Sequence, residues 1–204
     1  MNNIKQLLSS RILVLDGAMG TMIQRYQLTE EDFRKGWFED HPHKLKGDND
    51  ILVLTRPDIV REIHKQYLEA GADIIETNTF GATTVAQADY HLEHVVYEIN
   101  YHGAKIAREI CDEFTQKNPS KPRFVAGSIG PTTKLASMSP NVNDPGFRAI
   151  TFDELVVAFK QQATGLIDGG ADFLLVETIT DTLNAKAAMF AIDELAEERG
   201  IEIP

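Results

Sequence analysis

The chain has 204 residues, of which 43% are hydrophobic and 25% are charged, and its formal net charge is −11. These values describe a globular protein with a sizeable core, and an acidic balance without a basic stripe argues against nucleic acid as a partner. The single cysteine, with no signal peptide and no run of about 18 apolar residues, favours a cytoplasmic protein without disulfides or membrane contact.

Strands and helices alternate along the sequence, which favours an α/β fold with a parallel sheet and helical crossovers. Apolar runs predict strands at residues 12–15, 73–77, 124–128 and 172–176. Helical periodicity predicts crossover helices at residues 57–70, about 95–115, 151–168 and 181–199. The polar segment 132–149 is too long for an ordinary connection, so it is a candidate lid or binding loop.

Four βα units are half of an eight-unit barrel, which takes about 250 residues when complete. The sequence stops at residue 204, where a fifth strand would begin. We therefore expect residues 1–204 to be the N-terminal half of a (β/α)8 TIM-barrel domain, truncated before strand five, with no second domain. Such a half exposes unpaired strand edges and an apolar inner face, so we expect the chain to self-associate.

Three predicted strands deliver a carboxylate to their carboxyl ends. The first, interpreted as a buried strand, runs into Asp16 and a glycine-bracketed turn at residues 17–21. The second and fourth each follow a Gly-Ala-Asp motif and end in Glu-Thr, at Glu76 and Glu177. In a parallel α/β barrel this end binds ligands, so the three carboxylates predict one acidic mouth.

Hydrogen-bonding side chains after the second and third strands would join this mouth. The carboxylates suit an ammonium group, while free backbone N–H groups in the glycine-bracketed turn suit a carboxylate. An amino acid carries both groups. The candidate ligand-binding residues are Asp16, Gly17, Ala18, Met19, Glu76, Thr77, Asn78, Ser128 and Glu177.

Structural interpretations stay open for each of the three carboxylates. Asp16 could cap the helix that follows it, and Glu177 could form an ion pair with a lysine or arginine. Glu76 could be structural even if the other two carboxylates bind a ligand.

Other polar residues are better explained by structure than by chemistry. His91 and His94 are three residues apart, but without a third ligand they indicate a solvated helix face and not a metal site. The segment 46–50 resembles a calcium loop only in composition and is interpreted as a polar turn. Cys111 falls in the middle of a crossover helix and is interpreted as structural.

The motifs resemble the homocysteine-binding domain of cobalamin-dependent methionine synthases, in the homocysteine S-methyltransferase family. The most specific matches are DFR at 32–34, LKGDNDIL at 45–52, GADIIETNTF at 71–80, VAGSIGPT at 125–132 and NDP at 143–145. Single-domain homocysteine methyltransferases are expected to share the Leu-Asp-Gly, Gly-Ala-Asp and Glu-Thr elements but to lack LKGDND. The resemblance implies that Asp16 and Glu177 bind the substrate ammonium and that residues 17–21 lie near its carboxylate.

The same resemblance implies a methyltransferase of methionine biosynthesis, which uses methylcobalamin, recharged by 5-methyltetrahydrofolate, to methylate zinc-activated homocysteine. The family's three zinc-ligand cysteines are expected downstream of Pro204, so the resemblance implies no metal ligand and no catalytic residue within this chain. Folate, cobalamin and reactivation domains of the same full-length chain are the implied partners, and the fragment alone is expected to be inactive. Two alternatives stay open: a cobalamin-independent enzyme that uses S-methylmethionine, and a non-catalytic half-barrel that binds an amino acid.

Overall fold

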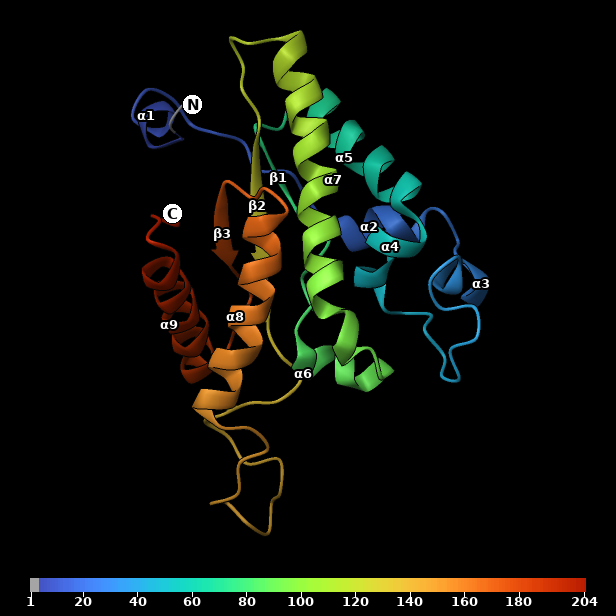
Figure 1. Cartoon of the computed structure of the whole chain (residues 1–204), viewed down its shortest axis with the longest axis vertical. Coiled ribbons are helices and arrows are strands. Elements are labelled where there is room, and N and C mark those ends of the chain that lie inside the picture. Colours follow the sequence, from blue (N-terminus) through green and yellow to red (C-terminus); the bar gives the residue numbers. More distant parts are fainter. Residues whose placement is uncertain (1–3) are drawn as a thin grey trace.

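The computed structural model describes residues 4–204. At its centre lies a parallel three-stranded sheet, whose strand order follows the sequence: β1 (Ile74–Glu76), β2 (Phe124–Ile129) and β3 (Phe173–Val176). Glu76 lies opposite Ala126 in the first pair of strands, and Ser128 lies opposite Leu175 in the second. The prediction of an α/β fold with parallel strands is confirmed (Figure 1).

Four long helices connect and flank these strands: α5 (Pro57–Ala70), α7 (Val96–Lys117), α8 (Phe152–Asp168) and α9 (Thr182–Arg199). Figure 1 shows α7 and α8 in front of the sheet, with α5 and α9 to either side. Shorter helices fill the connections: α1 (Ile4–Leu8), α2 (Met19–Gln24), α3 (Glu30–Arg34), η1 (Asn49–Ile51), α4 (Leu52–Thr55), α6 (Thr84–Gln87), η2 (Ala88–Tyr90) and η3 (Glu93–Val95). The four long helices match the predicted crossovers to within two residues at each end.

The helix ends follow the local signals in the sequence. Pro57 occupies the first turn of α5, and Gly71 ends that helix with a φ of 114°, in the left-handed region that glycine adopts without strain. Thr151 and Glu154 form the predicted capping box of α8. The Asp181 carboxylate caps α9 by accepting the N–H of Leu183 at 2.9 Å. These ends therefore depend on residues close in sequence.

The two faces of the sheet are covered differently. Ile75 and Val125 point into the larger core cluster, which contains side chains of α5 and α7, and Ile129 points into a second cluster with α8 and α9. The opposite face carries Phe124 and Ala126, which pack against side chains of α1 and the segment that follows it. The helical layer thus covers one face of the sheet much more completely than the other.

The prediction of a buried first strand at residues 12–15 is wrong in both the extent and the burial of that segment. Residues 12–15 form a single parallel bridge, between Leu15 and Ile74, and not a continuous ladder. Ile12 is 88% exposed and Val14 55% exposed. The segment 12–15 has a neighbouring strand on one side only, and no described helix packs over the side chains of Ile12 and Val14. These two apolar side chains therefore stay exposed.

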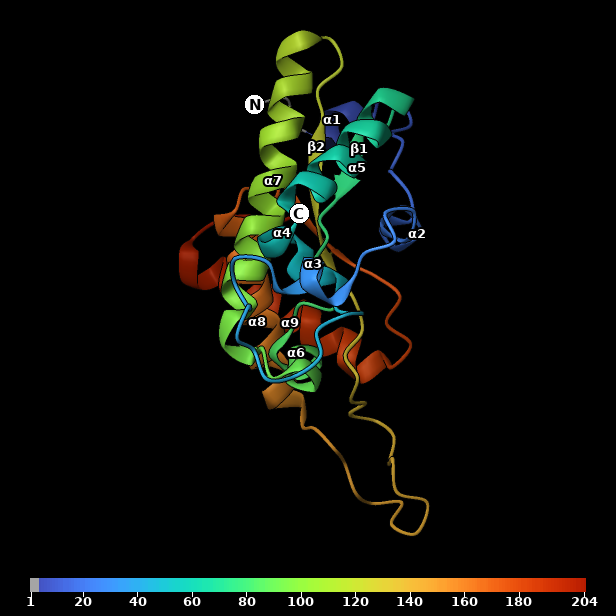
Figure 2. The same cartoon turned by 90° about the vertical axis from the view of Figure 1, so that its right-hand side faces the viewer.

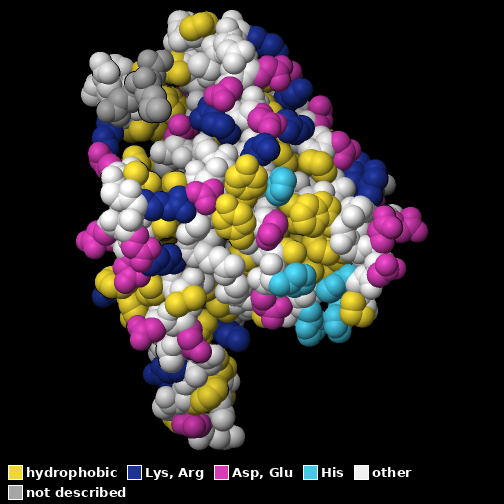
Figure 3. Space-filling view, viewed as in Figure 1, with side chains coloured by type: hydrophobic (Ala, Val, Ile, Leu, Met, Phe, Trp, Pro, Cys, Tyr) yellow, Lys and Arg dark blue, Asp and Glu magenta, His cyan; other side chains and the backbone are white. Residues whose placement is uncertain are grey.

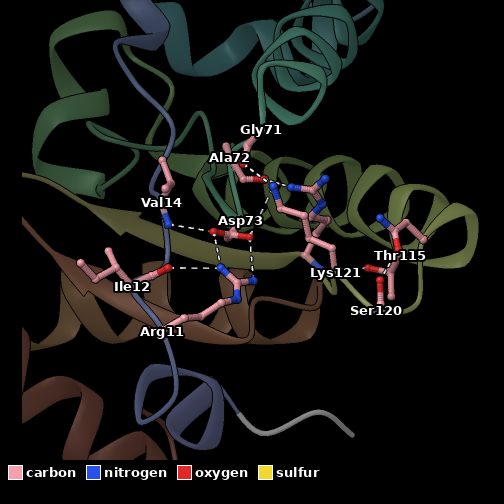
Figure 4. A network of polar contacts seen from close by, with 11 residues as sticks. Arg11, Ile12, Val14, Gly71, Ala72, Asp73, Thr115, Ser120 and Lys121 are labelled. Carbon is pink, nitrogen blue, oxygen red and sulfur yellow. Dashed lines mark hydrogen bonds and ion pairs between the residues drawn. The ribbon is translucent and has the colours of Figure 1, made fainter.

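Both Gly-Ala-Asp motifs join neighbouring strands at their amino ends. Asp73, 2% exposed, accepts the Val14 N–H at 2.9 Å and both terminal nitrogens of Arg11, as Figure 4 shows. Asp172 repeats the arrangement, because it accepts the Val125 N–H and an Arg108 nitrogen, both at 2.7 Å. The recurrence of the motif therefore reflects how each strand is attached to the preceding one.

The long polar segment 132–149 projects away from the sheet, past the end of α8 (Figures 1 and 2). Its beginning is anchored to α9, because Asn184 accepts the Ala136 N–H at 3.0 Å and Asp181 accepts the Ser137 N–H at 2.9 Å. The prediction of a lid is not supported for the projecting part, since only Thr133 of this segment borders the cavity described below. Within residues 4–204, no helix is both long enough and apolar enough to cross a membrane.

Candidate functional site

A cavity of about 640 Å³ opens at the carboxyl ends of the strands. All nine residues predicted to bind a ligand line it: Asp16, Gly17, Ala18, Met19, Glu76, Thr77, Asn78, Ser128 and Glu177. They come from the ends of all three strands and from the turn after residue 15. The structure thus brings these residues together, and their role in binding stays a prediction.

Asp16 is held beside the end of β1. Its two carboxylate oxygens both lie 3.2 Å from the backbone nitrogen of Glu76, which donates to them. The carboxylate makes no capping bond to α2, whose N-cap is Ala18, so the capping interpretation is wrong. Burial, followed by the negative charge of Glu76, raises the pKa of Asp16 to about 8.

Glu76 and Glu177 approach each other from β1 and from the end of β3. Burial raises the pKa of Glu76 to about 7, helped by the charge of Glu177 and by a hydrogen bond that protonated Glu76 donates to it. The Ser128 hydroxyl donates to Glu177 at 2.6 Å. No lysine or arginine of the described chain forms an ion pair with Glu177, which contradicts the ion-pair interpretation.

Two further contacts fix the wall of the cavity behind these carboxyl groups. The Thr77 hydroxyl accepts the Ser128 N–H at 3.0 Å and lies 2.6 Å from the Thr79 hydroxyl, which links β1 to β2.

Thr178, directly after Glu177, has a φ of 57°, which is unfavourable for a β-branched residue. Strained backbone of this kind is often found at functional sites.

The segment 46–50 is more than the polar turn that the sequence suggested. Gly47, Asp48, Asn49 and Asp50 all line the cavity. The Asn49 carbonyl accepts from the Asn78 amide at 2.6 Å, and Asp50 accepts the Gly81 N–H at 3.0 Å. These bonds attach the segment to the turn after β1, a contact between residues about 30 positions apart that local composition does not reveal.

A second segment that the sequence interpretation missed is 86–90, from which Ala86, Gln87, Asp89 and Tyr90 line the cavity. Gln87 is buried and its side-chain nitrogen donates to Asp48 at 3.1 Å. The signal for these residues is weak, because α6 and η2 are too short to show clear periodicity.

The electrostatics of the cavity are one-sided. The described lining contains no lysine, arginine or histidine. It contains six acidic side chains: Asp16, Asp48, Asp50, Glu76, Asp89 and Glu177. Burial raises the pKa of Asp48 to about 6, and burial together with the charge of Asp48 raises the pKa of Asp50 well above its usual value. Such a cavity favours a ligand that carries positive charge or many hydrogen-bond donors.

Outside the cavity, the rings of His41, His43 and His91 contact one another, and Figure 3 shows a group of histidine side chains on the surface of the molecule. His91 follows η2 in a left-handed conformation and its ring stacks on His43 at 3.9 Å, while His94 belongs to η3. Both are exposed, as predicted, but they do not share one helical turn. The irregular backbone between the two short helices breaks the helical spacing on which that prediction depended.

Cys111 is buried on α7, where burial raises the pKa of its thiol to about 12, so its structural interpretation is supported. Within residues 4–204, no three histidine, cysteine, aspartate or glutamate side chains are placed to hold a metal ion. The described cavity lining contains neither cysteine nor histidine. These residues do not fit a zinc site, so no metal-dependent step is assigned to them.

The fold and the cavity together define a class: a partial parallel α/β barrel with an acidic cavity at the carboxyl ends of its strands. The chain belongs to the homocysteine S-methyltransferase family, whose sequence pattern it matches over residues 13–203.

Solved structures of the homocysteine methyltransferase MmuM from Escherichia coli are similar to the chain. The metallated form has a TM-score of 0.69 and 23% identity, and the oxidised form 0.70 and 24%. These matches cover 97% and 98% of this chain but 63% of each MmuM chain. The chain therefore spans less than two thirds of these proteins, which supports a partial barrel, and at this identity the likeness establishes the fold alone.

Proposed function

We propose that this chain provides the amino-acid-recognition part of a homocysteine methyltransferase site. The observation that carries the proposal is the meeting of Asp16, Glu76 and Glu177 in one cavity of a family member, whose described lining contains no lysine, arginine or histidine. An ammonium group placed among these carboxylates would supply the missing positive charge and donate charge-assisted hydrogen bonds to them. We also propose that the complete enzyme, of which this chain is a part, transfers a methyl group to homocysteine.

In this proposal the carboxylates orient the substrate and do not act as acids or bases. Asp16 and Glu177 hold the ammonium, and Ser128 keeps Glu177 in place through its 2.6 Å hydrogen bond. Backbone N–H groups in residues 17–21 bind the substrate carboxylate near the start of α2. Two anchored ends restrict the side chain of homocysteine to a narrow range of orientations, which prepares its sulfur for an in-line reaction.

The methyl donor in our proposal is methylcobalamin, recharged by 5-methyltetrahydrofolate, as in methionine synthase. Its support is the LKGDND segment at 45–50, whose last four residues border the cavity. Zinc, when bound, would lower the pKa of the homocysteine thiol and so increase its thiolate fraction. Its ligands in this proposal lie outside residues 1–204, as do the folate, cobalamin and reactivation domains.

A pair of ligands tests the recognition step directly. L-Homocysteine and 4-mercaptobutyrate share the thiol and the carboxylate, but only the first has an ammonium group. We expect isothermal titration of the purified chain to give about 10-fold or more tighter binding of homocysteine, since one charge-assisted contact contributes about 1.5 to 3 kcal/mol. Equal affinities, or no binding of homocysteine, would contradict the proposal.

A further inference from the structure

Two buried side chains of the cavity lining have oxygens without a hydrogen-bond donor. Asp48 is 3% exposed and Gln87 is 1% exposed, and they contact each other through the 3.1 Å bond from Gln87 Nε2 to Asp48 Oδ1. Asp48 Oδ2 and Gln87 Oε1 have no partner within the described chain. Buried acceptors are normally satisfied, so this pair requires an explanation.

The charged side chains around the pair are all acidic, and the backbone N–H groups of Asp50 and Ile51 lower the pKa of Asp48 while its Oδ2 keeps no partner in the described chain. Asp50 and Asp89 line the same part of the cavity, and the described lining contains no basic side chain. A buried carboxylate without a cation destabilises the folded protein unless a ligand compensates for it. The pair comes from the segments 46–50 and 86–90, whereas the carboxylates proposed to bind the substrate ammonium come from the turn after residue 15 and the strand ends.

The cavity also has more room than one small amino acid needs. Its volume of about 640 Å³ lies in the range of pockets that enclose drug-sized ligands. A methyltransferase must bring a second reactant, the methyl donor, to the bound substrate. Homocysteine anchored by Asp16 and Glu177 would leave the Asp48 and Gln87 side of the cavity available to that donor.

We propose that Asp48 and Gln87 form an acceptor subsite that binds an N–H donor group of the methyl donor. This inference rests on the proposed function and adds the site of the second reactant. Two sources share this chemistry: the ammonium group of a small donor such as S-methylmethionine, and the carboxamide side chains of the corrin ring in methylcobalamin. In either case Asp48 Oδ2 and Gln87 Oε1 accept hydrogen bonds that the described chain does not supply.

The test compares the purified chain with its Asp48→Asn and Gln87→Met variants. S-Methyl-L-methionine and methylcobalamin are titrated separately, with equilibrium dialysis as the readout. We expect at least one donor to bind the original chain and to bind each variant about fivefold or more weakly. Binding of S-methylmethionine alone identifies the ammonium source, and binding of methylcobalamin alone identifies the carboxamide source. Asp153→Asn, an exposed change at the start of α8, is the matched control.

The Tm of thermal unfolding is a second readout. If Asp48 had a purely structural role, its replacement would lower the Tm, whereas a ligand-binding role predicts the opposite. Asp48→Asn removes a buried negative charge that no cation of the described lining balances, so we expect an equal or higher Tm together with weaker donor binding. A lower Tm with unchanged donor affinity would overturn the proposal, as would the absence of donor binding to the original chain. Asp48-dependent binding of Mg²⁺ or Ca²⁺ in place of either donor would also overturn it. L-Homocysteine binding is measured in parallel: its loss from the original chain contradicts the proposed function, whereas its retention without donor binding contradicts only this subsite.

Discussion

Arg11 and Asp73 form a two-bond ion pair that fixes the segment carrying Asp16 against β1. Both nitrogen–oxygen distances are 2.9 Å, and one Asp73 oxygen also accepts the Val14 N–H (Figure 4). The pair holds the amino end of this segment, while Asp16 accepts the Glu76 N–H at its carboxyl end. A structural contact at one end of the strands thus supports the position of a candidate binding residue at the other end.

Removal of the Asp73 carboxylate should destabilise the fold. We expect Asp73→Ala to lower the free energy of unfolding by about 2 kcal/mol, because it removes a buried carboxylate that pairs with Arg11 and leaves the partly buried Val14 N–H without its acceptor. Urea unfolding followed by circular dichroism measures the change. Asp112→Ala removes an exposed ion pair with Arg108 and should cost less than about 1 kcal/mol. Equal losses in both variants would show that burial of Asp73 contributes little.

The two proposed ammonium partners can be tested one at a time. We expect Asp16→Asn and Glu177→Gln each to weaken homocysteine binding by about 1.5 to 3 kcal/mol, since each loses a charge-assisted contact. Isothermal titration measures the affinity, and Glu62→Gln on the exposed side of α5 is the control. Unchanged affinity in both variants would return these residues to a structural role.

Homocysteine binding should depend on pH in a defined direction. The pKa values of Asp16 and Glu76 are raised to about 8 and about 7, so both groups are largely protonated at pH 6 and lose protons as the pH rises. An ammonium group prefers the ionised carboxylates, so affinity should rise from pH 6 to about pH 8, and binding at pH 7 should release protons. Titrations in two buffers with different ionisation enthalpies measure that release. The same apparent enthalpy in both buffers would contradict the linkage.

Acid should destabilise the protein partly through His64. This residue is fully buried on α5, and burial lowers its pKa to about 4, against about 6.5 in the unfolded chain. Unfolded molecules therefore bind the proton first, and the resulting loss of stability begins near pH 6.5 and is complete below about pH 4. The difference in pKa corresponds to about 3 kcal/mol. Stability measured at several pH values for His64→Leu should fall less over this range, and parallel curves would refute the assignment.

The incompletely covered side of the sheet leads us to expect self-association. Ile12 and Val14 are largely exposed beside β1, and β3 is only half-buried along its length. Sedimentation velocity should show species larger than the monomer that increase with protein concentration, and a combined Ile12→Lys and Val14→Lys variant should reduce them. A single monomeric boundary, with strongly protected amides in residues 12–15 and in β3, would refute this expectation.

Much of the fold and part of the candidate site were determined by the sequence itself. Helix limits depend on local chemistry, such as the capping box of Thr151 or the left-handed conformation of Gly71. Carboxylates at the ends of parallel strands lie at one edge of a sheet, so Asp16, Glu76 and Glu177 could be assigned to one mouth before any distance was known.

Tertiary structure alone decided the features that depend on contacts between distant segments. Apolar composition predicted a buried first strand, but burial requires covering elements, and none described covers Ile12 or Val14. Asp48 belongs to a polar segment whose composition predicts only a turn, and it enters the cavity wall because Gln87, 39 positions away, contacts it. Hydrophobic periodicity and capping report local conformation, whereas the burial of a polar side chain depends on which remote residues pack against it.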